Sequence, residues 1–148
     1  MTLEYRNFRP EDKSEWSQLY GAYLEFYEAT TSDDSRNLVW DRLLDRQIRG
    51  LGAFQNGSLV GIAHFHVQLS TWGDNGHLYL EDLFVSENSR NQGIARALIK
   101  EIEKIAQEEQ CSEMFWITRE TNSTARALYD SVAKLTDFVR YELQINLE

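Results

Sequence analysis

The amino-acid sequence predicts an α/β protein with a mixed sheet. The first observation is the order of the expected elements, because strands and helices are interleaved along 148 residues. The second is the stretch His77–Ile99, which begins as an apolar strand, passes through a polar loop and opens a helix. The length suits one core, so we expect a single domain over residues 1–148.

The N-terminal third is expected to hold a strand and two helices. Leu3–Phe8 alternates as a strand does. Pro10–Glu28 has proline and acids in its first turn, followed by an aromatic stripe at helical spacing. Asp34 or Ser35 could cap the second helix, and Gly50 would end it.

Three strands and a helix are expected next. Leu51–Phe54 and Leu59–Leu69 flank Asn56-Gly57, a dipeptide typical of a tight hairpin turn. Leu78–Val85 is rich in bulky residues that suit a buried, pleated surface. Ile94–Gln110 carries apolar residues at a helical period.

The C-terminal part completes the expected order β-α-α-β-β-β-α-β-α-β. Glu113–Thr118 is predicted to be a strand and Asn122–Val132 a helix. The alternation over Phe138–Ile145 predicts a final strand.

Composition and charge narrow the range of functions. A net charge of −9 argues against a nucleic-acid partner. No apolar run approaches the length of a membrane span, and the N-terminus lacks the apolar core of a secretory signal. Cys111 is the only cysteine, so an internal disulfide is impossible. We therefore expect a cytoplasmic protein without membrane or nucleic-acid partners.

The hexapeptide Arg90–Ala95 has the properties of an anion-binding loop. It lies where a helix is expected to begin, and the first turn of a helix offers unpaired N–H groups and the positive end of the dipole. Gly93 allows close approach of a ligand, and Arg90 adds a positive charge, which suits a phosphate or pyrophosphate. The spacing matches neither a P-loop nor a dinucleotide fingerprint.

This loop resembles the acetyl-CoA loop of the GNAT N-acetyltransferase superfamily, Arg/Gln-x-x-Gly-x-Gly/Ala after a strand. Leu80–Val85 precedes it at family spacing, and Asn122-x-x-Ala125-x-x-x-Tyr129 stands where the family's last core helix belongs. The detailed resemblance is to the diamine and histone/polyamine-type branch. It implies a mostly antiparallel mixed sheet with a splayed parallel central pair, acetyl-CoA as cofactor and a homodimer formed through C-terminal strands.

The resemblance also implies which residues form the site. Tyr129 corresponds to the family tyrosine near the cofactor sulfur, and Glu81 to the glutamate that deprotonates the amine, often through water. A core tyrosine and a salt-bridged strand residue are the structural alternatives. Asp82 would point to the other face of an ideal strand, although a bulge would exchange the two acids. The implied cofactor-binding residues are Leu83, Phe84, Val85, Arg90, Asn91, Gln92, Gly93, Ile94, Ala95 and Asn122.

Several further polar residues could take part in substrate binding or metal binding. Four acids, Glu25, Glu28, Asp33 and Asp34, lie where the family's substrate lip belongs and could bind an amine or form a solvated acidic face. The two histidines His64 and His66 share one face of a predicted strand. Two ligands are too few for a metal ion, so no metal site is expected. Cys111 is expected to be packed and non-catalytic.

The leading hypothesis is an acetyl-CoA-dependent N-acetyltransferase acting on a primary amine, namely a polyamine, another small amine or an exposed lysine. Transfer is expected by direct attack in a ternary complex. The alternatives are a non-catalytic module that binds CoA as a sensor and an interaction domain that binds no cofactor.

Overall fold

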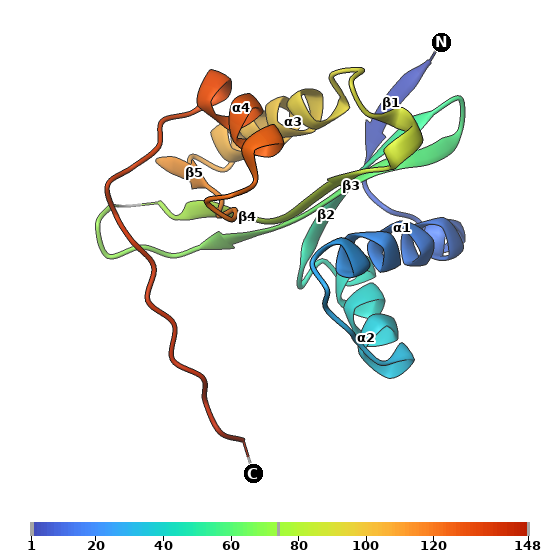
Figure 1. Cartoon of the computed structure of the whole chain (residues 1–148), viewed down its shortest axis with the longest axis horizontal. Coiled ribbons are helices and arrows are strands. Elements are labelled where there is room, and N and C mark those ends of the chain that lie inside the picture. Colours follow the sequence, from blue (N-terminus) through green and yellow to red (C-terminus); the bar gives the residue numbers. More distant parts are fainter. Residues whose placement is uncertain (1, 74, 148) are drawn as a thin grey trace. The chain divides into compact units, whose positions relative to one another are not determined.

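The computed structural model describes residues 2–73 and 75–147, which divide into two units. The first unit is Met1–Ile117, and its sheet carries α1 and α2 on one face and α3 on the other (Figure 1). The second unit is Thr118–Glu148, whose described residues form α4 (Ser123–Val132) and an extended segment.

The described strands form one sheet in the order β1-β2-β3-β4-β5. The first four strands pair antiparallel, and β5 pairs parallel with β4 through the partners of His77, Leu78 and Tyr79. The pairing ends there, so the predicted mostly antiparallel sheet with a splayed parallel pair is confirmed. The strands are β1 (Leu3–Arg6), β2 (Arg49–Gln55), β3 (Ser58–Gln68), β4 (His77–Val85) and β5 (Glu113–Phe115).

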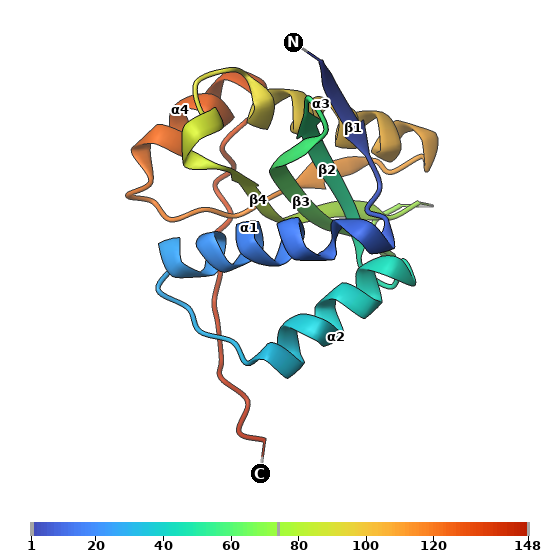
Figure 2. The ribbon, with the colours of Figure 1, turned by 90° about the vertical axis from the view of Figure 1, so that its right-hand side faces the viewer.

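The helices of the first unit bury apolar side chains against both faces of the sheet. Figure 2 views the sheet from the side of α1 (Lys13–Phe26) and α2 (Asp33–Leu44). On this side Trp16 and Trp40 pack with Ile62 of β3. Two short 3₁₀ helices, Pro10–Asp12 and Glu87–Ser89, adjoin α1 and the loop before α3. No helix among the described residues is both long and apolar enough to cross a bilayer.

The helix α3 (Ile94–Glu108) lies close to β3 because of Gly61. Its buried stripe is Ile94, Leu98 and Ile102, with at most 2% of each residue exposed. A Cβ on Gly61 would lie 3.1 Å from Leu98 Cδ1 and 3.3 Å from Ile94 Cγ2. These contacts would be tighter than ordinary van der Waals contacts, so a side chain at this position would require Leu98 and Ile94 to shift by a few tenths of an ångström.

A β-bulge interrupts β4 at Glu81. Asp82 pairs with His64 and Leu80 pairs with Phe65, so Glu81 is the extra residue. Beyond the bulge Asp82 lies opposite His64 on the face toward α1. The bulge considered from the sequence is therefore present. The side chains of Glu81 and Asp82 both lie on the sheet face that carries His64 and His66.

Two predicted boundaries in the N-terminal half were wrong. The cap of α2 is Ser32, whose Oγ accepts the N–H of Ser35 at 3.1 Å, and not Asp34 or Ser35. Gly50 does not end the helix but lies in β2, where a Cβ would come 2.7 Å from the Phe8 ring. The glycine is needed for close packing rather than for a helix cap.

The predicted final strand over Phe138–Ile145 was also wrong. The described residues after α4, 133–147, form neither helix nor strand. The alternation is present in the sequence, but no backbone partner pairs with this segment among the described residues. The strand predicted over Glu113–Thr118 is shorter than expected and ends at Phe115.

Candidate active site

The loop before α3 has an open, left-handed backbone. Asn91 and Gly93 have φ values of 63° and 79°, and Gly93 is the N-cap of α3 without a side-chain cap hydrogen bond. Nothing lies within 4 Å of the position that a Gly93 Cβ would take. The first-turn N–H groups of a helix lack intrahelical partners, so this loop could hold an anionic group such as a phosphate.

Side chains of the loop are held by neighbouring elements. Arg90 donates its Nε–H to the carbonyl of Val85 at 3.1 Å, and its guanidinium lies 5.3 Å from the Phe84 ring centroid. The Gln92 side chain accepts a hydrogen bond from Gln55 of β2 at 3.0 Å. Ile94 is buried below the loop. These contacts hold the side chains of the loop, and they fix where the positive charge of Arg90 lies.

Glu81, the candidate base, is a partly exposed carboxylate with one histidine partner. Its side chain is 46% exposed, and Oε1 lies 2.9 Å from His66 Nε2. An ionised carboxylate can only accept, so His66 Nε2–H is the donor. Solvent access and an orienting partner are both suitable for a group that must take up a proton.

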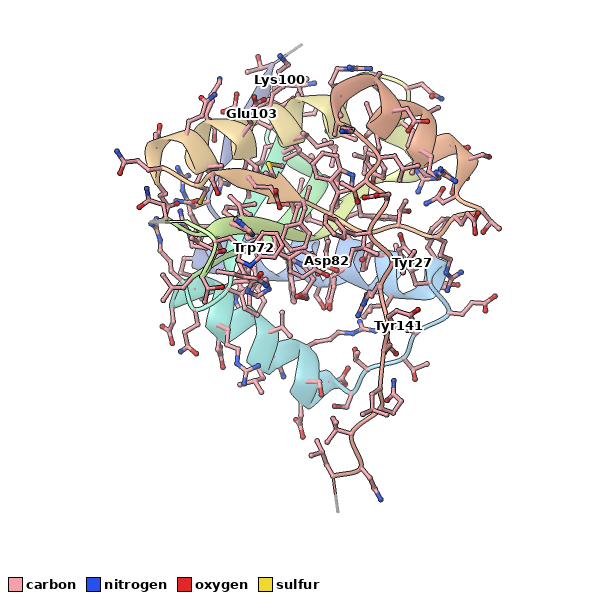
Figure 3. The ribbon with its side chains drawn as sticks, turned by 90° about the vertical axis from the view of Figure 1, so that its left-hand side faces the viewer. Tyr27, Trp72, Asp82, Lys100, Glu103 and Tyr141 are labelled. Atoms are coloured by element: carbon pink, nitrogen blue, oxygen red, sulfur yellow. The ribbon has the colours of Figure 1, made fainter. Side chains whose placement is uncertain are left out.

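Asp82 is held far more tightly than Glu81. Tyr23 of α1 donates to Oδ1 at 2.7 Å, and His64 Nδ1 lies 2.9 Å from Oδ2. The other nitrogen of His64 accepts from the indole N–H of Trp16 at 2.9 Å. An indole N–H can only donate, so His64 is neutral, with its proton on Nδ1. Figure 3 shows Asp82 on the β4 ribbon, on the side that faces α1.

Two tyrosines of α1 near Asp82 are strongly held in their protonated form. Burial, followed by the negative charges of Asp82 and Glu81, raises the pKa of Tyr20 to about 12. Burial, followed by the charge and the hydrogen bond of Asp82, raises the pKa of Tyr23 well above its ordinary value. Tyr23 is therefore a permanent hydrogen-bond donor to Asp82 at physiological pH.

The four predicted substrate acids fall into two pairs. Glu25 and Glu28 line a surface pocket of about 410 Å³ at the end of α1, together with Arg36. Asp33 and Asp34 lie in the first turn of α2, where carboxylates complement the helix dipole. Neither of these aspartates is among the residues that line that pocket. Two of the four predicted substrate acids therefore line the pocket, and the other two lie at the start of α2.

Asn122 and Tyr129 belong to the second unit and are described within it. Asn122 is the N-cap of α4, and its Oδ1 accepts from the N–H of Ala125 at 3.4 Å. Its amide also donates to Thr118 Oγ1 at 3.3 Å. Tyr129 lies seven positions further along, in α4, and is half-buried. Asn122 thus caps the helix that the sequence predicts from this position.

Cys111 and the histidines of β3 have surroundings that can be described one by one. Burial, followed by the charge of Glu109, raises the pKa of the Cys111 thiol, which disfavours a nucleophilic thiolate. The part of the chain that the structure describes contains no group of three or more metal-ligating side chains. His64 instead belongs to the core, while His66 is the partner of Glu81.

The pairing of both β3 histidines with the two acids of β4 was not predicted from the sequence. One signal was available in β4 itself. The residues facing α3 are Leu78, Leu80, Leu83 and Val85, so the apolar spacing changes from two to three at the bulge. Partners on β3 and α1, by contrast, depend on sheet register and could not be derived from spacing alone.

Taken together, a splayed mixed sheet and an anion-binding helix start define an α/β protein that can hold a nucleotide-like cofactor. Comparison with known proteins makes this specific. The model of the acetyltransferase (GNAT) family matches residues 16–133, and the chain belongs to this family. Acetyl-CoA is the acetyl donor of GNAT acetyltransferases, and the chain is an N-acetyltransferase that uses it.

Two relatives of known activity agree with this assignment. The chain is 29% identical over 137 residues to the D-amino-acid N-acetyltransferase of Saccharomyces cerevisiae, covering 90% of this chain and 85% of that protein. It is 31% identical over 88 residues to the thialysine N-epsilon-acetyltransferase of Caenorhabditis elegans, covering 60% of this chain and 54% of that protein. The match therefore spans about half the length of the thialysine enzyme.

A solved structure confirms the fold. AAC(6')-Iy, in complex with a bisubstrate analogue that contains CoA, superposes with a TM-score of 0.83 at 18% identity. The alignment covers 99% of this chain and 100% of that chain. At this identity the likeness concerns the fold alone.

Proposed function

We propose that the chain acetylates a cationic primary amine by direct attack on acetyl-CoA in a ternary complex. The observation that carries the proposal is the Glu81 carboxylate, which is exposed and oriented on the strand that leads into the anion-binding loop. Such an amine, with a pKa near ~10.4 for lysine, must lose a proton before it can attack. A positioned carboxylate supplies that step.

Two residues divide the proton transfers in the proposed reaction. The amine nitrogen bonds to the acetyl carbon, and Glu81 accepts the amine proton directly or through a water molecule. As the carbon–sulfur bond breaks, the Tyr129 hydroxyl donates its proton to the leaving thiolate. The leaving thiolate, with a thiol pKa of ~8.5, benefits from a positioned proton donor while the bond breaks. Cys111 takes no part, and no acetyl-enzyme forms.

The predicted cofactor residues form the proposed binding surface. The N–H groups from Gln92 to Ala95 would hold the pyrophosphate, with Arg90 assisting. Asn122 would contact the cofactor beside its role as helix cap. The last residues of β4, Leu83, Phe84 and Val85, would lie along the pantetheine arm.

A polyamine or lysine-like acceptor is our first choice. The net charge of −9 and the pocket with Glu25 and Glu28 favour a cation over an anion. The yeast relative is named for D-amino acids and the nematode relative for thialysine, and both kinds of acceptor present a primary amine. Asp33 and Asp34 would add to the local negative potential.

The test is a set of three variants assayed for CoA thiol release with polyamines, D-amino acids and lysine peptides. Tyr129→Phe deletes one hydroxyl and should lower kcat by ~10²–10⁴-fold while CoA binding persists. Glu81→Gln should lower kcat/KM similarly, most strongly at low pH, where the amine proton is hardest to remove. Cys111→Ala is the control and should keep full activity.

Each contrary result has a definite meaning. Full activity of both Tyr129→Phe and Glu81→Gln would reject the mechanism, and a trapped acetyl group on Cys111 would replace it. If CoA binds but no amine in the panel is acetylated, the result supports the alternative of a non-catalytic module that binds CoA as a sensor. An anionic amine with the highest kcat/KM would reject the preference for cations.

We also propose that residues 1–148 act as one domain and that two copies form a homodimer. Residues Leu135, Phe138, Val139, Tyr141, Leu143, Ile145 and Leu147 after α4 are between 69% and 91% exposed. Exposed apolar side chains gathered in one segment often become covered in an interface. The cytoplasmic location expected from the sequence stays a prediction.

A further inference from the structure

The two histidines of β3 lie on the same face of the sheet but have different surroundings. His64 is 2% exposed, and both of its ring nitrogens are engaged, one by Trp16 and one by Asp82. His66, two residues further along, has a side chain that is 30% exposed. His64 therefore belongs to the packed network under α1, whereas His66 can act on a group that faces solvent.

The ring of His66 is fixed by its neighbours in the sheet. It stacks on Tyr79, its register partner on β4, with 6.2 Å between ring centroids and an interplanar angle of 25°. Tyr79 in turn stacks on Phe115 of β5 at 4.9 Å and 11°. A ring supported in this way can hold a hydrogen-bond donor at a defined place.

Glu81 needs such a donor because of the bulge. It is the extra residue of β4 and has no residue opposite it on β3. Its side chain is substantially exposed and has three rotatable bonds, so packing alone does not fix the carboxylate. The hydrogen bond from His66 Nε2 to Glu81 Oε1 is the contact that selects one orientation.

We propose that His66 is a positioning residue that acts through Glu81. Its Nε2–H holds one carboxylate oxygen, which leaves the other oxygen directed for the incoming amine or for the water that carries its proton. This inference rests on the proposed role of Glu81 as the base. It assigns no direct contact between His66 and the acceptor, so the effect of His66 must depend on Glu81.

The experiment is a double-mutant cycle with a rescue variant, using the full chain. His66→Leu removes the donor, and kcat should fall about ten-fold, with little change in the KM for the amine. His66→Gln places an amide N–H near the position of Nε2 and should restore most of the lost activity. In a Glu81→Gln background, His66→Leu should cause no further loss.

A matched control is available in the same strand pair. His77 of β4 lies 3.8 Å from Glu113 of β5, another histidine–carboxylate contact, at the start of β4. His77→Leu should leave kcat unchanged, and thermal melting should show that all variants are folded.

The outcomes separate this inference from the proposed function. If Glu81→Gln impairs turnover but His66→Leu does not, the positioning role is rejected and Glu81 remains the base. If His66→Leu causes the same loss with and without Glu81, or His66→Gln fails to rescue, the role is likewise rejected. If Glu81→Gln has full activity, the assignment of the base fails and the positioning role fails with it.

Discussion

Asp12 is a buried carboxylate whose charge is satisfied from two directions. Arg6 binds it through both terminal nitrogens, at 2.8 and 3.1 Å, and the N–H of Arg9 donates at 2.7 Å. Since hydrogen bonds to a charged group are worth roughly 1.5–3 kcal/mol, Asp12→Asn should lower the free energy of unfolding by about 2–3 kcal/mol. Urea denaturation at pH 7 measures this loss. Glu4 pairs with the same Arg6 but is 60% exposed, so Glu4→Gln should cost less than about 1 kcal/mol.

The same pair makes a prediction about pH. The hydrogen bond from Arg6 lowers the pKa of Asp12 below its ordinary value of 3.8. A lowered native pKa stabilises the fold above the unfolded value and loses that effect as pH falls through the native value. The stability gap between the wild type and Asp12→Asn should therefore be constant above about pH 5 and shrink below pH 3.8. A gap as large at pH 2 as at pH 7 would contradict this assignment.

At the level of elements, the start of α3 depends on the backbone of Gly93. Its φ of 79° is costly for a residue with a side chain, although the surrounding space is open. Gly93→Ala should therefore lower the free energy of unfolding by only about 1 kcal/mol. Gly93→Glu adds a negative charge where phosphate is proposed to bind, and CoA affinity should fall by far more than the stability does. Titration calorimetry with CoA compares the two variants, and equal affinities would reject the placement.

Most elements were predictable from their sequence patterns, and the failures have physical causes. Leu78–Val85 and Ile94–Gln110 were found because a buried strand and an amphipathic helix have distinct periods. The pairing of Asp82 with His64 was not found, since it depends on the register between β3 and β4. The segment Phe138–Ile145 alternates as a strand does, but a strand also requires a neighbouring backbone. Pattern alone does not supply that neighbour.

At the level of the whole molecule, the exposed C-terminal segment predicts how copies associate. Tyr141, labelled in Figure 3, is 91% exposed, and Leu143 is 83% exposed. Leu143→Asp should convert the proposed homodimer to a monomer, because it places a charge among apolar side chains. Gln144→Asp changes the adjacent position of the alternation and should leave the dimer intact. Light scattering on the eluting protein measures both, and a monomeric wild type at micromolar concentration would contradict the proposal.

Gly61 has a consequence for how the anion-binding loop could change during evolution. The residue precedes Arg90, the first residue of the loop, by 29 positions, yet its missing side chain sets the height of the α3 start above the sheet. A single added methyl group would push Leu98 and Ile94 outward by a few tenths of an ångström. A mutation under the helix could therefore change the depth of the proposed phosphate-binding surface, without any change in the residues that would touch the ligand.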